Sequence, residues 1–116
     1  MYVDGFVIPV KTDQKEKFER VAREMAVLFK DYGATRVVET WADDVPVGEV
    51  TSFTRAVQLE EDETVVFSWI EFPDKATRDA CNKKVFEDPR MEDMRLDDVI
   101  DGRRMIFGGY EVLSDR

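Results

Sequence analysis

The chain has 116 residues, of which 43% are hydrophobic and 37% charged, and its formal net charge is -9. That length fits one domain, residues 1–116, with a hydrophobic core of its own. The acidic balance disfavours nucleic acid and anionic membranes as partners, because both reward clusters of lysine and arginine. No apolar run approaches the roughly 18 residues of a membrane span, and no secretory signal opens the chain, so we expect a cytoplasmic protein.

The cysteine and histidine counts narrow the possible chemistry. Cys81 is the single cysteine, which excludes a disulfide within the chain, and there is no histidine. A histidine triad, a histidine-ligated haem and the usual zinc sites therefore need residues that this chain lacks. We expect no metal and no cofactor, and any acid–base chemistry falls to carboxylates, tyrosine, lysine or Cys81.

The first part of the chain predicts a strand, a helix and a second strand. Residues 2–10 are rich in β-branched and aromatic side chains, with apolar residues on both strand faces. Residues 13–33 carry apolar side chains at helical spacing, with Asp13 as the expected N-cap and Gly33 as the expected C-terminal cap. Residues 35–42 form the next expected strand.

A connection longer than a hairpin needs follows over residues 43–63. Its middle, residues 50–59, is expected to form either a short edge strand or a lid. The acidic run EEDE at residues 60–63 lacks the spacing of a known calcium loop, so it indicates a solvated acidic surface.

The run TVVFSWIEF, residues 64–72, is the densest β pattern in the chain and is apolar on both faces, which predicts a central strand. A second helix is predicted to begin after its cap, Asp74, and to run to about residue 87. The last expected strand covers residues 103–113, where the glycine pair at 108–109 suggests a bulge.

This order of elements is β-α-β-β-α-β, which predicts a ferredoxin-like α+β fold with an antiparallel sheet. Two helices cover only one face of a four-stranded sheet, whereas the central strands are apolar on both faces. A twofold contact is the commonest way to bury a self-complementary face. We therefore predict a homodimer in which two sheets pack face to face.

Six segments, VDGFVIPV, ADDVPVG, TSFTRAV, VVFSWI, DPRM and DGRRMIFGGY, span nearly the whole chain in order. In these segments the chain resembles the YbaA-like family, a bacterial family of unknown function in the dimeric α/β barrel superfamily. The resemblance implies a dimeric barrel of face-to-face sheets. The superfamily includes cofactor-free monooxygenases, haem-degrading enzymes, lactone isomerases and ligand-sensing domains, and such a fold does not fix function by itself.

Polar side chains on otherwise apolar strands are the best markers of a cavity in such a barrel, and Asp4, Glu39 and Ser68 are such residues. We hypothesise that Asp4, with Glu39 as a second candidate, is a general base if its carboxylate is desolvated. The alternative is that both carboxylates lie at solvated strand edges or in a structural pair.

Aromatic and loop residues are further candidates for ligand binding. Trp41 and Trp69 would line the cavity, although core packing is the commoner role of a tryptophan. Thr51, Ser52 and Arg55 lie in the long connection, where a lid over the ligand is expected.

These residues support three functional hypotheses. The first is a homodimer that binds a small apolar or aromatic molecule in a barrel cavity. The second is a cofactor-free monooxygenase or isomerase with Asp4 or Glu39 as its base. The third is an interaction module without a ligand, for which the barrel would be packed solid.

Overall fold

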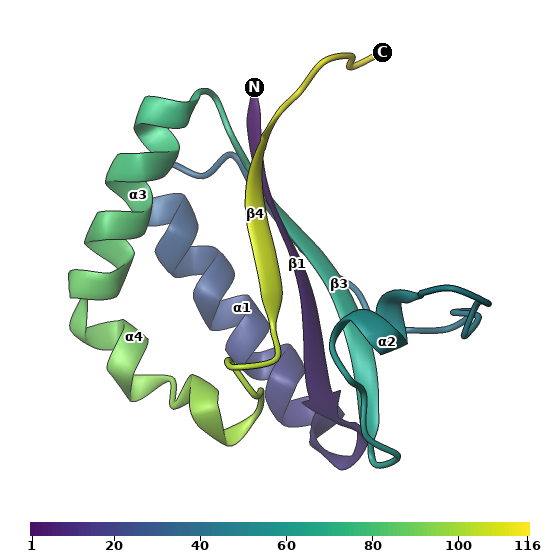
Figure 1. The fold of residues 1–116 in the computed structure, drawn as a ribbon. Coiled ribbons are helices and arrows are strands. Elements are labelled where there is room, and N and C mark those ends of the chain that lie inside the picture. Colours follow the sequence, from purple (N-terminus) through teal and green to yellow (C-terminus); the bar gives the residue numbers. More distant parts are fainter.

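Four antiparallel strands form one sheet in the order β2-β3-β1-β4 in the computed structural model, which describes residues 1–116. The strands are β1 (Tyr2–Lys11), β2 (Arg36–Glu39), β3 (Glu63–Phe72) and β4 (Ile106–Glu111). The central strands β1 and β3 pair along their whole length (Figure 1). The predicted ferredoxin-like α+β order is therefore confirmed.

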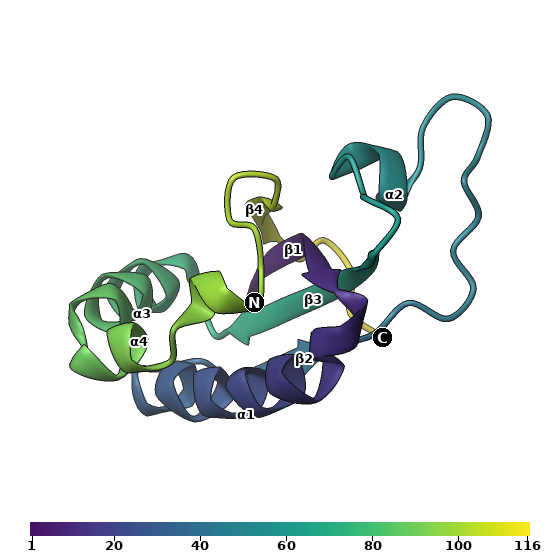
Figure 2. The ribbon, with the colours of Figure 1, turned by 90° about the horizontal axis from the view of Figure 1, so that it is seen from below.

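The helices lie on both sides of the sheet but not evenly. The long helices α1 (Lys15–Asp31) and α3 (Lys75–Glu87), followed by the short α4 (Pro89–Asp93), lie on one side, and α2 (Phe53–Ala56) lies on the other (Figure 2). Two 3-10 turns, Thr12–Gln14 and Leu96–Asp98, complete the regular structure. None of the helices combines the length and the apolar character needed to cross a membrane.

One of the two predicted N-caps is correct. The side chain of Asp74 accepts a hydrogen bond of 2.7 Å from the backbone N–H of Thr77 and so caps α3 as expected. Asp13 instead lies in a 3-10 turn, and α1 begins after Gln14 without a side-chain cap. That prediction is wrong because the 3-10 turn moves the start of the α-helix along the chain.

The connection between β2 and β3 differs most from its prediction. Residues 50–59 do not form an edge strand, because Ser52 accepts a hydrogen bond of 3.2 Å from the backbone N–H of Arg55 and starts the helix α2. Strand β2 is also shorter than expected and ends at Glu39. Trp41 leaves the strand and packs against Phe18 of α1, with the ring centroids 6.2 Å apart.

Strand β4 is shorter than predicted and has no bulge. Its pairing with β1 runs without interruption from Val7 opposite Ile106 to Tyr2 opposite Glu111. A Cβ atom at Gly109 would lie against the Tyr2 hydroxyl and 2.7 Å from a guanidinium nitrogen of Arg78. The glycine therefore makes room for two side chains, and the bulge prediction is wrong.

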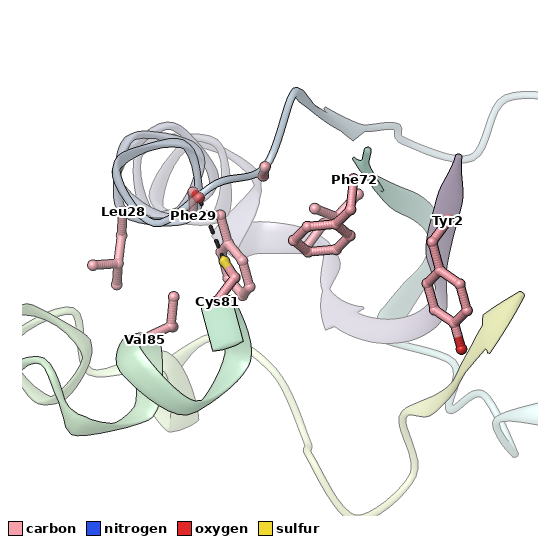
Figure 3. Close-up of a cluster of buried hydrophobic side chains, with 8 residues drawn as sticks. Tyr2, Leu28, Phe29, Phe72, Cys81 and Val85 are labelled. Carbon is pink, nitrogen blue, oxygen red and sulfur yellow. Dashed lines mark hydrogen bonds between the residues drawn. The ribbon is translucent and has the colours of Figure 1, made fainter. Parts of the chain in front are cut away.

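The core lies between the sheet and α1 with α3 (Figure 3). One of its two clusters consists of Tyr2, Leu28, Phe29, Ala34, Ile70, Phe72, Cys81 and Val85. The Cys81 thiol is fully buried and donates a hydrogen bond of 3.5 Å to the backbone oxygen of Phe29. Burial raises the pKa of this thiol, so Cys81 packs as a small apolar residue.

The register decides which residues of the central strands face the helices. The even-numbered residues of β1 and β3 point to the helix side, and the odd-numbered residues point to the other side, which we call the open face. Ser68 is therefore buried under the helices, whereas Trp69 lies on the open face. Part of the open face is covered by α2, because Phe53 packs edge-on against Phe67 at 5.7 Å.

Candidate functional site

A cavity of about 220 Å³ lies between the helix layer and the sheet. Fifteen of the twenty residues that line it are hydrophobic, so its wall suits an apolar molecule. The strands contribute Phe6, Ile8, Val37 and Ile70, and α1 contributes Phe18, Val21, Ala22, Met25 and Phe29.

One polar group of the cavity is an ion pair between β1 and α3. The guanidinium of Arg78 donates from Nε to both carboxylate oxygens of Asp4 at 3.0 Å, and its Nη2 lies 2.8 Å from Oδ1. Asn82, one helical turn further along α3, donates to Asp4 Oδ2 at 3.4 Å. Asp4 is only 4% exposed, and its hydrogen bonds with the guanidinium hold the pKa of Arg78 above its ordinary value. Asp4 therefore lies in a buried ion pair.

The second polar group consists of Glu39, at the end of β2, and Ser68, which lies opposite Glu39 on the neighbouring strand β3. Glu39 is exposed to solvent at the sheet edge and also lines the mainly apolar cavity. Desolvation raises the pKa of Glu39 to about 7, and the Ser68 hydroxyl opposes the rise. A carboxyl with this pKa changes charge near neutral pH.

Two exposed phenylalanines lie on the cavity wall, far from the Glu39 edge of the sheet. Phe86 of α3 is 71% exposed and Phe107 of β4 is 70% exposed. Phe107 also stacks on Phe6, with ring centroids 6.3 Å apart. Because both rings line the cavity and meet solvent, they mark an entrance between α3 and the edge strand β4.

The structure brings together three of the predicted site residues. Asp4, Glu39 and Ser68 line the cavity, as expected from polar residues on apolar strands. Trp41 and Trp69 lie outside it: Trp41 packs on Phe18, and Trp69 donates a hydrogen bond of 2.9 Å to Glu71 on the open face.

The loop candidates lie away from the cavity. Thr51, Ser52 and Arg55 belong to the segment at α2, on the other side of the sheet. The Arg55 guanidinium donates to the backbone oxygen of Glu49 at 2.7 Å, and the Ser52 hydroxyl caps α2. The hydrogen bonds of Ser52 and Arg55 stay within their own segment, and this segment covers part of the open face and not the cavity.

Arg78, Asn82 and the two entrance phenylalanines are the site residues that the sequence did not identify as ligand-facing. Arg78 and Asn82 share the buried side of α3 with Cys81 and Val85, at spacings of three, four and seven residues. The signal in the sequence is the presence of these two polar residues on the side of the helix that is otherwise buried.

A second hollow is polar and is closed by its own ion pairs. Arg104 donates to both carboxylate oxygens of Glu63, at 2.7 and 2.6 Å, and to Asp101 at 2.9 Å. Lys11 pairs with Asp62 at 2.9 Å. Glu63 is buried, so the acidic run is not wholly a solvated surface as predicted. These pairs fasten the turn before β4 to the start of β3.

Comparison with known proteins places the chain among uncharacterised relatives. Residues 1–102 match the family described as "Protein of unknown function (DUF1428)". The uncharacterized protein YbaA of Escherichia coli K12 is 53% identical over 114 residues, which cover 98% of this chain and 97% of that protein.

Two solved structures share the fold at low sequence identity. An uncharacterized NIPSNAP domain protein from Burkholderia xenovorans aligns with a TM-score of 0.62 and 14% identity, covering 98% of this chain and 96% of the other. A dimeric ferredoxin-like protein from an uncultured marine organism aligns with a TM-score of 0.60 and 9% identity, covering 100% and 98%. At these identities the likeness extends to the fold alone.

Proposed function

The chain belongs to the YbaA-like family of proteins of unknown function, DUF1428, and from its own structure we propose that it binds a compact apolar or aromatic molecule as a homodimer. The cavity between helices and sheet carries this proposal. An engineered apolar cavity of about 150 Å³ in another protein binds benzene, so about 220 Å³ leaves room for a ring with a short substituent.

The open face supports the homodimer. Phe67 is 45%, Ile106 is 44% and Tyr110 is 64% exposed on it, and Ile106 lies in the same cross-strand row as Phe67, with Val7 of β1 between them. Exposed apolar groups gathered on one face are typical of an interaction surface. A second copy is the simplest partner, because a twofold axis through such a face brings like side chains together.

Ligand capture from the native host tests the binding proposal. Protein purified from that host should carry an additional mass in native mass spectrometry, which metabolite analysis would identify. Ala22→Leu fills part of the cavity from α1 and should abolish the added mass, whereas Ala80→Leu, on the exposed side of α3, should retain it. A protein that carries no ligand and binds no small apolar compound would overturn the proposal.

A cofactor-free enzyme is the second candidate function, and Glu39 is the observation that favours it. A general base works best with a pKa near the working pH, and the pKa of Glu39 is raised to about 7. Asp4 suits this role less well, because its carboxylate is engaged by Arg78. Turnover of the captured molecule, lost in Glu39→Gln with binding retained, would distinguish this enzyme from a binding protein.

A further inference from the structure

We propose that the molecule bound in this cavity is an amine, with a compact apolar body against the aliphatic and aromatic wall and its ammonium group at Glu39. This inference rests on the proposed binding function and specifies the chemical class of the ligand.

The two carboxylates of the cavity differ in what already neutralises them. Asp4 has the guanidinium of Arg78 at 2.8 Å and the amide of Asn82 as donors. Glu39 forms no ion pair with any residue of the chain, and Ser68 is the polar side chain beside it. The cavity therefore has a carboxylate at one end that lacks a cation.

The charged groups on the elements around Glu39 have other partners. On the neighbouring strands, Arg36 and Glu71 face the open side of the sheet and lie 3.5 Å from each other. From α1, the ammonium of Lys15 lies over the Trp41 ring, 5.4 Å from its centroid. The α1 residues that line the cavity itself are apolar.

An ammonium group supplies what this end of the cavity lacks. A carboxylate against an apolar wall is costly to ionise unless a positive charge and hydrogen-bond donors reach it. Without a ligand, Glu39 meets this cost by holding its proton up to a pKa of about 7. An anionic ligand is disfavoured by Glu39 and by the net charge of -9.

Isothermal titration calorimetry with benzylamine and its near-isosteric neutral analogue, benzyl alcohol, tests the ligand class. Benzylamine should bind more tightly, and its binding should release about half a proton at pH 7, since Glu39 is then half protonated. Titrations in two buffers of different ionisation enthalpy measure this release. The affinity for benzylamine should rise from pH 5.5 to 8, and that for benzyl alcohol should stay constant.

Glu39→Gln keeps the size of the side chain and removes its charge. It should weaken benzylamine binding by about tenfold or more, remove the proton release and leave benzyl alcohol binding unchanged. Glu24→Gln, on the exposed side of α1, is the matched control and should change neither ligand's affinity. The pH dependence of the unmodified protein gives a result that does not depend on the folding of the variant.

The outcomes separate this inference from the proposed function. Equal binding of both compounds without proton release would overturn the amine and leave the binding protein intact. Proton uptake on binding would also overturn it, because Glu39 would then act as a neutral donor. If neither these nor other small apolar compounds bind, the proposed function fails, and the inference fails with it.

Discussion

Asp4 and Glu39 line the same cavity, but their neighbours differ: a cation lies beside Asp4 and none lies beside Glu39. Asp4 faces Arg78 across the gap between β1 and α3 and is held in an ion pair. Glu39 faces Ser68 and apolar side chains, and its pKa is raised to about 7. A cation within about 4 Å favours the charged form of a carboxylate, and an apolar wall opposes it.

Removal of Arg78 should destabilise the protein more than its exposure suggests. Arg78→Leu leaves the buried Asp4 carboxylate without a cation, and breaking such a pair costs about 3 kcal/mol. Urea unfolding followed by circular dichroism measures the change. Asp4→Leu combined with Arg78→Leu should recover much of the loss, because no buried charge then remains.

Arg36 offers the matched control for this pair. Arg36→Leu removes an exposed partner 3.5 Å from Glu71 and should cost less than about 1 kcal/mol. If Arg78→Leu lowers the free energy of unfolding no more than Arg36→Leu does, the Asp4–Arg78 pair contributes no more to stability than an exposed ion pair.

Glu39 should make the stability of the protein depend on pH. Its pKa is about 7 in the folded state, above its ordinary value of 4.5, so folding favours the protonated form. Its stabilising contribution is present below pH 4.5 and is lost as the pH rises through 7. Glu39→Gln should therefore be more stable than the unmodified protein at pH 8, by on the order of 1 kcal/mol after allowance for solvent contact, and similar at pH 4.

Thermal unfolding of both proteins across this pH range measures the difference. A constant difference from pH 4 to 8 would contradict a raised pKa at Glu39.

Strand patterning identified part of the site. Asp4, Glu39 and Ser68 are polar residues on apolar strands, and alternation alone indicates their position. Arg78 was beyond such reasoning, because its partner Asp4 lies 74 residues away in the chain and only the packing of α3 on β1 joins them. The two tryptophans were misleading, since size and apolarity do not reveal which face of a sheet a residue occupies.

At the scale of elements, the edge strand β4 approaches β1 closely because Gly109 has no side chain. Both Tyr2 and Arg78 reach over this position, and the Arg78 guanidinium lies 5.2 Å from the centre of the Tyr2 ring. Gly109 thus belongs to the packing of α3 onto the sheet.

Gly109→Ala should destabilise β4 by about 1 to 3 kcal/mol, because its Cβ would displace the Tyr2 hydroxyl and a guanidinium held by Asp4. Hydrogen exchange of the β4 amides and urea unfolding measure the effect. Gly108→Ala is the control: its Cβ would lie 3.3 Å from the exposed Tyr110 hydroxyl, which is free to move. If both variants lose the same free energy of unfolding, the close approach of Tyr2 and Arg78 to Gly109 is not the cause.

Element existence was easier to predict than element ends. Every long strand and helix was expected from periodicity, whereas α2 was not, because a four-residue helix shows no period and depends on the Ser52 cap. Strands β2 and β4 are shorter than their patterns, since pairing with a neighbour, and not propensity, decides where a strand ends.

For the whole molecule, the open face is the main surface that the chain does not cover. Helix α2 covers one end of it, at Phe67, and the remainder presents aromatic and β-branched side chains to solvent. The apolar residues on both faces of the central strands predicted that one face would lack a covering layer, and the short α2 covers only part of that face.

Phe67→Glu should convert a dimer into a monomer, because it places a charge on the open face, which we expect to be buried between copies. Sedimentation velocity at micromolar concentration measures the mass. Val27→Glu makes the same change at an exposed position of α1 and should leave the dimer intact. A monomeric mass for the unmodified protein would contradict the assembly.

The strand order also constrains how the protein is made. Strand β1 leaves the ribosome first, but its two partners are β3 and β4, and β4 ends at Glu111. Its hydrogen bonds to β3 therefore wait for residue 72 and those to β4 for residue 111, and until then the apolar side chains of β1 and α1 have no complete sheet to pack against. In that interval the apolar side chains of the nascent N-terminal segment stay exposed, which is the property of a segment that a chaperone binds.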